Sequence, residues 1–464
     1  MNSNMQDKPN YTSAFLVVVG LFFMWGFMTV LNDILIPYLK GVFELNYAGA
    51  MMVQFSFFGA YFVGSLAYFI ISATAGDPIM RIGYKNGILI GLLISALGSA
   101  LFIPAANYKM YGFFLTALFI MALGFTLLQI AANPYVAILG PEKSASSRLN
   151  LAQGFNSLGT TISPLIGGYL IFKFFIGPEG SADAVKMPYL VFSVIFLLLA
   201  VFIKFSHLPR LTSPVNIQRS AGALKYSNLT LGIVAIFMYV GAEVSIGSIL
   251  ISYLGLENIA GLGEAEASTY VSFYWGGLMI GRFLGAVSLA DFSKRGLKYF
   301  LMFAIPSAAF LVIWYTHGIH IALIYSVFLI VNLAAFFLGR SLPHRTLFLF
   351  ALINISLLVI TLSSEGKTAM WTVIGIGLFN SIMWSNIFTL AIEGLGKFKS
   401  QGSSLLVMAI LGGAVIPVIQ GAVADRYGVH VSFAVPLFAF AYLAFYGIAG
   451  YKKKIIGSLK SVQS

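Results

Sequence analysis

The stretch FFMWGFMTVLNDILIPYL at residues 22–39 recurs in looser form as FMYVGAEVSIGSILISYL at residues 237–254. Both copies are apolar, both have glycine in fifth place, and both end in Tyr-Leu, at an offset of 215 residues. A nearly equal offset of 217 relates a second pair of glycines, Gly59 and Gly64, to Gly276 and Gly281. Self-similarity of this kind, in one chain direction, predicts a duplicated helical unit.

The offset between the copies grows to 253 residues further along the chain. The later matches are Asn133-Pro134-Tyr135 with Asn386-Ile387-Phe388, and Gly159, Pro164 and Gly168 with Gly412, Pro417 and Gly421. The additional 36 residues are enough for two closely packed helices at a rise of about 1.5 Å per residue. We therefore predict an inserted helical hairpin at about 298–340. Because it has few polar side chains apart from Asn332, we expect it to be a lipid-facing addition.

Composition places the chain in a membrane. Of its 464 residues, 59% are hydrophobic and 9% are charged, and apolar runs of about 20 residues, long enough to cross a bilayer, recur throughout. The net charge of +12 is distributed over short loops between these runs, so we expect a lipid bilayer and no nucleic acid as partner. The absence of cysteine excludes thiol catalysis and disulfides. The five histidines form no metal-spaced pair within a span, so we expect no metal or cofactor.

Hydropathy predicts fourteen membrane spans. They lie near residues 12–38, 48–75, 86–106, 111–138, 148–172, 188–206, 228–253, 268–290, 298–315, 320–339, 346–363, 370–392, 403–424 and 431–450. The first apolar run is too long for a signal-peptide core and no small-residue cleavage site closes it, so we interpret it as a retained span. Placing both termini in the cytoplasm puts 20 of the 27 Lys and Arg residues inside. The positive-inside rule therefore favours cytoplasmic termini.

The repeat and the spans together predict the organisation of the chain. We expect an all-α membrane protein with an N-terminal six-helix bundle at 1–206, a cytoplasmic connector at 207–226 and a C-terminal bundle at 227–464, the last containing the hairpin. Parallel duplication of a six-helix unit is typical of transporters that bind their ligand between the two halves.

Three ionisable residues are predicted deep inside spans, where each costs about 2.5–3.5 kcal/mol. Asp33 shares a helix face with Trp25 and Thr29 and has no cation within a turn on its own helix. We interpret it as a carboxylate that binds a ligand hydroxyl or a coupling cation, the alternative being a structural partner of a neighbouring helix. For Glu243, a binding role and an ion pair with Arg282 both stay open, and Arg282 is interpreted as structural.

Amide side chains form a second polar pattern. Gln129 and Asn133 lie one turn apart on the fourth span, and Gln153 and Asn156 belong to a stripe on the fifth. Amides both donate and accept hydrogen bonds, as a ligand rich in hydroxyl groups requires. Hydrogen bonding between helices is the alternative explanation. The candidate binding residues are Asn32, Asp33, Gln129, Asn133, Gln153, Asn156, Glu243, Asn380 and Asn386.

Several stretches closely resemble the fucose:proton symporter family of the major facilitator superfamily, in its bacterial glucose/galactose transporter branch. They are LNDIL at 31–35, QIAANPY at 129–135, RLNLAQGFNS at 148–157, YVGAEVSIGS at 239–248 and GRF at 281–283. The resemblance covers nearly all of the chain except the predicted hairpin.

The resemblance implies two six-helix bundles, with Asp33 in cation coupling and Gln153 and Asn156 in sugar contact. One position departs from it. Gln129 stands where fucose permease has a glutamate, and an amide cannot titrate, so sodium competes with the proton as the coupled ion. A second departure is the sequence Trp384-Ser385-Asn386, where many members of the family have Phe-Pro-Thr, and it bears on which sugar fits.

The sequence thus predicts a cation-coupled hexose symporter, with proton or sodium as the ion and glucose or galactose favoured. It is expected to act as a monomer in a bacterial inner membrane and not as an enzyme. The alternatives are a symporter for fucose, mannose or N-acetylglucosamine, and an exporter of drugs or metabolites.

Overall fold

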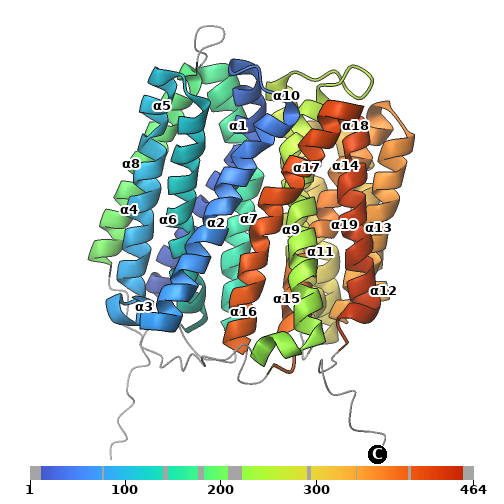
Figure 1. The fold of residues 1–464 in the computed structure, drawn as a ribbon. Helices are drawn as coiled ribbons and strands as arrows, with labels where there is room; N and C mark the ends of the chain where they lie inside the picture. The colour runs from blue at the N-terminus through green and yellow to red at the C-terminus, as the bar shows by residue number, and fades with distance from the viewer. Residues whose placement is uncertain are drawn as a thin grey trace, which may run out of the picture.

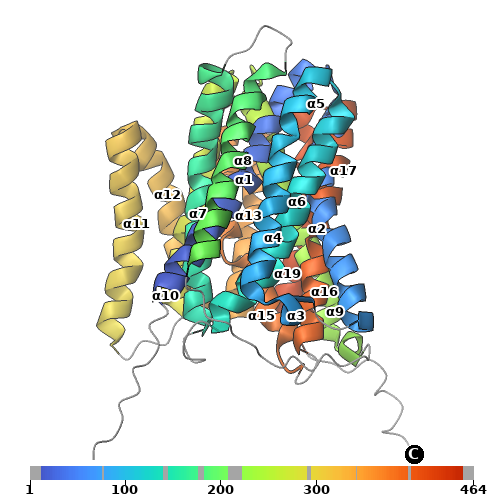
Figure 2. The same ribbon diagram turned by 90° about the vertical axis from the view of Figure 1, so that its left-hand side faces the viewer.

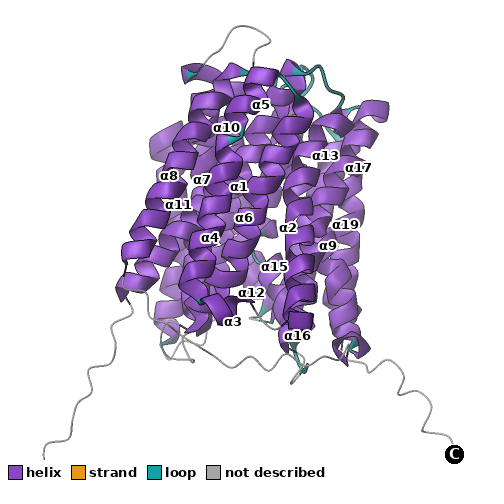
Figure 3. Cartoon of the chain, turned by 60° about the vertical axis from the view of Figure 1, so that its left-hand side comes forward, coloured by secondary structure: helices purple, strands orange, loops and turns teal. Residues whose placement is uncertain are grey.

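The computed structural model describes residues 12–75, 78–138, 145–175, 182–206, 222–289, 294–340, 342–395 and 399–452. The part of the chain that it describes is built from helices and loops, without strands (Figure 3). The predicted all-α fold is therefore confirmed.

Fourteen membrane-length helical segments run through the bundle, as predicted. They are α1 (Thr12–Val42), α2 (Tyr47–Ala75), α4 (Tyr84–Ala100) with α5 (Phe102–Tyr108), α6 (Tyr111–Ile138), α7 (Ala145–Tyr169) with η2 (Leu170–Phe174), α8 (Lys186–Phe205), α9 (Ser227–Leu254), α10 (Glu264–Leu289), α11 (Arg295–His317), α12 (Ile319–Gly339), α13 (Pro343–Ser363), α14 (Gly366–Asn380) with α15 (Met383–Ile392), α16 (Lys399–Met408) with α17 (Gly412–Tyr427), and α18 (Val429–Ser432) with α19 (Ala434–Phe445) and η7 (Tyr446–Gly450). A short helix, α3 (Pro78–Ile82), links α2 to α4.

The described residues contain 12 helical segments that are long and apolar enough to cross a membrane. The two membrane-length helices that do not meet this criterion, α7 and α10, pack against each other where the two halves of the molecule meet. Described polar side chains of these helices, such as Ser157 and Arg282, therefore lie at an internal boundary instead of against lipid.

The two halves stand side by side in Figure 1, the first from blue to green and the second from green to red. Helix α1 begins and α19 finishes at the same end of the bundle, which we call the terminal end. At the opposite end, the far end, α1 finishes and α2 begins.

The same close helix contact occurs once in each half. A Cβ atom on Gly159 of α7 would overlap the Phe23 carbonyl of α1, and a Cβ atom on Gly412 of α17 would overlap the Phe237 carbonyl of α9. Glycine is thus required at both positions because the backbones approach so closely. These glycines are the pair that the repeat relates, so the duplication in the sequence is also a duplication in packing.

The inserted pair α11 and α12 lies on the outside of the second half. Figure 2 shows α11 as the outermost helix and α12 between it and the rest of the bundle. Helix α11 has few buried residues, as expected for a lipid-facing addition. Helix α12 also exposes apolar side chains such as Val327 and Ile330, but its opposite face is more than a lipid-facing addition, because Tyr325 and Asn332 are buried there and bonded to α10 and α14.

Candidate functional site

Asp33 is the centre of a hydrogen-bond network between the two halves. The side chain is 2% exposed, and its carboxylate accepts from three donors on three helices. Gln54 Nε2 of α2 lies 3.0 Å and Ser248 Oγ of α9 lies 3.3 Å from Oδ1, while Trp275 Nε1 of α10 lies 3.1 Å from Oδ2. Gln54 Nε2 also lies 2.9 Å from Ser248 Oγ. Asp33 therefore fastens the first half to two helices of the second.

The internal repeat explains why Asp33 meets Ser248. The two positions are related by the offset of 215 residues that relates the first span to its copy. Equivalent positions of a parallel repeat can touch where the halves meet along their common axis. Gly247 leaves room for this contact, because a Cβ atom there would come within 3.1 Å of Asp33 Oδ2.

The surroundings of Asp33 provide hydrogen-bond donors but no positive charge. Across the described residues, the ion pairs found are Lys186 with Asp183 and Arg282 with Glu243, so Asp33 has no ion-pair partner there. Gln54 Oε1, which is buried beside this carboxylate, has no hydrogen-bond partner in the described structure. A buried charge without a counterion is costly. The geometry thus suits a carboxyl group that gains and loses a cation.

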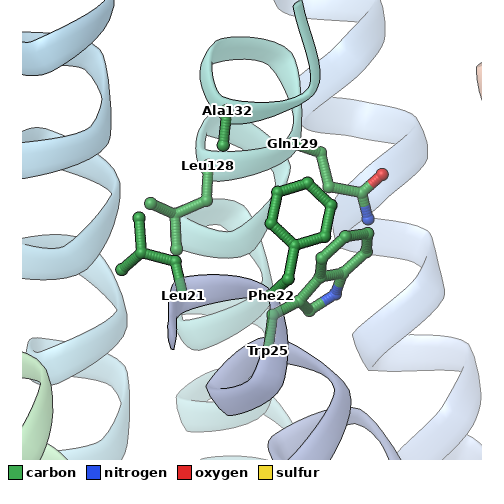
Figure 4. Close-up of a pocket in the computed structure, with 6 residues that line it drawn as sticks. All are labelled: Leu21, Phe22, Trp25, Leu128, Gln129 and Ala132. Atoms are coloured by element: carbon green, nitrogen blue, oxygen red, sulfur yellow. The ribbon is translucent and has the colours of Figure 1, made fainter. Parts of the chain in front are cut away.

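A small pocket with mostly apolar walls lies between α1 and α6. The pocket is lined by Leu21, Phe22, Trp25, Leu128, Gln129 and Ala132 (Figure 4). Trp25 Nε1 donates to the Tyr61 hydroxyl at 2.9 Å, and the Gln129 side chain is hydrogen-bonded to the same tyrosine. The pocket is about the size of one water molecule, and the polar atoms of Trp25 and Gln129 bond to Tyr61, so in this structure it holds no space for a sugar.

Arg282 makes a second connection between the halves. Its Nη2 atom lies 3.9 Å from Glu243 Oε1, and its Nε atom donates to the Ser381 carbonyl at 3.4 Å. Its Nη1 atom also hydrogen-bonds Ser157 Oγ of α7, in the other half. The ion pair that the sequence left open is therefore present, although at a distance too long for a hydrogen bond.

The interruption between α14 and α15 lies next to this arginine. Asn380, the last residue of α14, donates from Nδ2 to the Tyr274 hydroxyl at 2.9 Å and accepts from Asn354 Nδ2 at 2.9 Å. Its carbonyl accepts from the Tyr239 hydroxyl at 3.0 Å. A helix end leaves carbonyl groups without partners, and side chains from neighbouring helices satisfy them here.

The structure brings together only some of the predicted binding residues. Asp33 lies at the boundary between the halves, Gln129 lines the pocket, and Gln153 is half-buried on α7. Asn32 is fully buried, and neither polar atom of its side chain has a partner in the described structure. The side chain of Asn133 lies outside the described residues.

Three predicted residues instead hold helices together. Asn156 Nδ2 donates to the Phe22 carbonyl at 2.9 Å and so fastens α7 to α1. Asn386 Nδ2 donates to the Pro343 carbonyl at 3.1 Å, inside the second half. Asn380 is occupied by Tyr274 and Asn354. These contacts correspond to hydrogen bonding between helices, the alternative explanation for the amides.

Sequence reasoning missed Gln54, Ser248 and Trp275, the three donors to Asp33. An amide, a serine and a tryptophan are common in membrane helices, so none of them is conspicuous alone. For Ser248 a signal existed, because it is the repeat equivalent of Asp33. For Gln54 and Trp275 the sequence offers no such signal.

Comparison with known proteins agrees with the fold and the repeat. The Major Facilitator Superfamily model matches residues 14–343. The chain is 42% identical over 457 residues to a glucose/galactose transporter of Brucella abortus biovar 1 (strain 9-941), covering 97% of each protein. It is 31% identical over 463 residues to the L-fucose-proton symporter of Escherichia coli (strain K12), covering 94% of this chain and 92% of that one.

A solved structure shows the same architecture. The crystal structure of the transporter FucP in the outward conformation matches with a TM-score of 0.64 and 29% sequence identity, over 94% of this chain and 98% of that chain. The family model covers well over half of the sequence, and the relatives align over almost all of it. The chain therefore belongs to the Major Facilitator Superfamily.

Proposed function

We propose that this protein is a proton-coupled hexose symporter that imports glucose or galactose by alternating access. The observation that carries the proposal is Asp33, a buried carboxylate without a counterion that bonds to both halves of the molecule. The sugar class rests on the names of the relatives, a glucose/galactose transporter and an L-fucose-proton symporter.

The proposed organisation follows the sequence. An N-terminal bundle at 1–206 and a C-terminal bundle at 227–464, joined by a cytoplasmic connector at 207–226, rock about the sugar site. We place the protein in the inner membrane of a bacterium as a functional monomer, with both termini in the cytoplasm. The terminal end of the bundle is then its cytoplasmic end, and the far end faces outward.

Proton binding to Asp33 changes the bonds between the halves. As a carboxylate, Asp33 accepts from Gln54, Ser248 and Trp275. With a proton on Oδ1, that oxygen becomes a donor and needs an acceptor. Rotation of the Gln54 amide by half a turn offers Oε1, the unpartnered atom, and moves Nε2 away from Ser248. Protonation thus weakens one connection between the halves, which links the proton to the conformational change.

A proton suits this site better than sodium. The groups directed at the carboxylate are an indole N–H, an amide N–H and a hydroxyl, which are donors in the described geometry. A hard metal ion requires several oxygen ligands arranged around it. A proton on the carboxyl group requires a single acceptor, and Gln54 Oε1 supplies one after the amide rotates.

The decisive experiment is uptake of radiolabelled glucose into proteoliposomes under a proton gradient or a sodium gradient imposed separately. We expect accumulation under the proton gradient alone. Asp33→Asn should abolish accumulation while sugar exchange continues, because the neutral amide cannot bind a proton. Asp183→Asn, which removes a carboxylate paired with Lys186 by an i,i+3 contact, serves as the control.

Three results would contradict parts of the proposal. Normal gradient-driven uptake by Asp33→Asn would remove Asp33 from the coupling mechanism. Accumulation under sodium alone would replace the proton by sodium. Competition by unlabelled fucose, mannose or N-acetylglucosamine, without an effect of glucose, would change the sugar, and dye efflux insensitive to any sugar would point to an exporter.

A further inference from the structure

The inserted hairpin is attached to the second half by two buried polar side chains of α12. The Tyr325 hydroxyl donates to the Phe273 carbonyl of α10 at 3.0 Å, and Asn332 Nδ2 donates to the Leu378 carbonyl of α14 at 3.1 Å. Both side chains are at most 1% exposed. Polar anchors at two levels of one helix are not needed to fill a lipid-facing surface, which apolar side chains cover equally well.

Both carbonyl groups stand beside the residues of the site. Phe273 is followed directly by Tyr274 and Trp275, and Trp275 is a donor to Asp33. Leu378 lies two residues before Asn380, whose Nδ2 donates to the Tyr274 hydroxyl. The two hydrogen bonds from α12 therefore hold one backbone segment of α10 and one of α14. The Tyr274–Asn380 hydrogen bond connects the same two segments.

The carbonyl of Leu378 needs a partner because α14 ends at Asn380. The last four carbonyls of a helix lack intrahelical partners, and the membrane interior offers little water to replace them. Ser381 Oγ donates to this carbonyl at 2.8 Å, and Asn332 supplies the second bond. Asn332 is thus part of what permits α14 to stop and α15 to begin at this depth.

Glycines on the two core helices allow α12 to come close. A Cβ atom on Gly277 of α10 would lie 2.9 Å from the Tyr325 hydroxyl, and a Cβ atom on Gly375 of α14 would overlap the Phe328 ring. Aromatic side chains of α12 consequently occupy the space that ordinary side chains of α10 and α14 would fill. The contact thus pairs glycines of α10 and α14 with large aromatic side chains of α12.

We propose that the inserted hairpin is a brace for the transport site, with Asn332 and Tyr325 as positioning residues. Asn332 fixes the interruption between α14 and α15, and with it Asn380 and the Ser381 carbonyl that accepts from Arg282. Tyr325 fixes the segment of α10 that presents Trp275 to Asp33. Helix α11 packs against α12 and against α10, where the ring of His317 contacts the ring of Phe273.

The test uses the fact that the chain contains no cysteine. A single cysteine replaces Ser385, an exposed residue of α15 just beyond the interruption, and its labelling rate with a small maleimide reports how firmly α15 is held. In this background we expect Asn332→Leu to raise the labelling rate about fivefold, the effect of losing one buried hydrogen bond. Ser326→Ala, at a half-buried position of the same helix where the hydroxyl donates to the Leu323 carbonyl of α12 itself, should leave the rate unchanged.

Sugar uptake gives a second measurement, which alone rests on the proposed function. We expect Asn332→Leu to raise KM for the transported sugar more than it lowers the maximal rate, because the site residues are displaced and the coupling carboxylate is intact. Tyr325→Phe, which removes a single hydroxyl, should reduce accumulation relative to exchange, because it acts through Trp275. A transporter of another substrate would leave the labelling result valid and alter only the uptake assays.

Two outcomes would overturn the brace. One is a folded Asn332→Leu protein whose Ser385→Cys labelling and KM equal those of the parent. The other is equal loss of melting temperature in Asn332→Leu and Asn332→Ala with labelling unchanged, which would make Asn332 a general stabilising residue. If the leucine variant does not reach the membrane, Asn332→Ala, in which a water molecule has room to replace the amide, is judged by the same labelling criterion.

Discussion

Gln54 connects Asp33 to Ser248, so its amide senses the state of the carboxylate and touches the opposite half of the molecule. The ionised carboxyl group uses three hydrogen-bond donors, whereas the protonated carboxyl group needs one acceptor in exchange for a donor. Of its three neighbours in this network, Trp275 can only donate through its ring nitrogen, and Ser248 has a single hydrogen, which lies near both Asp33 Oδ1 and the Val244 carbonyl. The Gln54 amide is the neighbour that has a donor and also a separate, unpartnered acceptor.

Replacement of this amide tests its role. In Gln54→Leu, Asp33 loses one donor and the protonated form loses its acceptor, so we expect gradient-driven accumulation to fall at least about tenfold, the effect of a buried hydrogen bond to a charged group. Sugar exchange, which needs no net proton movement, should fall much less. The ratio of accumulation to exchange in proteoliposomes is the measurement.

Ser65→Ala provides the matched control for Gln54→Leu. Ser65 lies on the same helix and is buried, and its hydroxyl has no hydrogen-bond partner in the described structure. Its removal should leave both transport modes unchanged. An accumulation-to-exchange ratio for Gln54→Leu equal to that of Ser65→Ala would exclude a coupling role for the amide.

At the scale of the helices, close packing of α7 against α1 depends on Gly159. Because a Cβ atom there would overlap the Phe23 carbonyl of α1, Gly159→Ala should force α7 away from α1. We expect a loss of stability of about 1–3 kcal/mol from overpacking, visible as a lower melting temperature in detergent. Gly412→Ala should have the same effect in the second half.

Gly59→Ala is the control for the glycine variants. Gly59 is a helical glycine of α2, and a Cβ atom there would meet nothing within 4 Å. Alanine is favoured over glycine in a helix by about 1 kcal/mol, so this variant should be neutral or slightly stabilised. If Gly159→Ala and Gly59→Ala had the same melting temperature, the close approach of α1 and α7 would not require glycine at position 159.

Helix breaks mark the limit of prediction at this scale. The fourteen spans could be predicted because a membrane requires long apolar runs, and the hairpin because it lengthens the repeat offset. The span expected at 370–392 is present, but it consists of two helices, α14 and α15, interrupted after Asn380. No proline or glycine lies at residues 380–383, where the interruption falls, and side chains of three other helices satisfy carbonyl groups around it. Such partners are known only once those helices are packed.

The candidate site shows the same limit. Asp33 was identifiable because a charge in a span is costly, and it does lie at the boundary between the halves. Asn156 and Asn386 were expected to face a ligand, but bond to backbone carbonyls of neighbouring helices. Helical spacing places side chains on one face of a helix without specifying what that face meets. The division into binding and structural amides therefore requires the tertiary contacts.

At the scale of the whole molecule, a carboxylate near the far end of the bundle connects the two halves. Asp425, near the end of α17, accepts from the Tyr47 and Ala48 amides at 2.6 and 2.8 Å. These amides belong to the first turn of α2, so Asp425 caps a helix of the other half, with the charge on the favourable side of the helix dipole. Opening the far end requires this cap to be given up.

Removal of the cap should therefore favour the state open at the far end. A single cysteine at Ser272, a buried residue of α10 one turn from Ser268, would report access from that side. We expect Asp425→Ala to increase its maleimide labelling rate about fivefold, corresponding to a cap of about 1 kcal/mol. Asp183→Ala, which removes a carboxylate whose ion pair is to Lys186 in its own half, should not change the rate. Identical rates for the two variants would argue against a gating role for Asp425.

The neutral surroundings of Asp33 also have an electrical consequence. Glu243 and Arg282 cancel each other's charge, so a proton on Asp33 would leave the loaded centre of the molecule without net charge, and the empty centre would carry one negative charge. The inward transition of the carrier with proton and sugar bound would then be nearly insensitive to voltage. The return of the empty carrier, in contrast, would move a negative charge outward. An interior-negative potential drives that return by up to about 2.3 kcal/mol per 100 mV. Pre-steady-state currents should accordingly appear in the absence of sugar and vanish in Asp33→Asn.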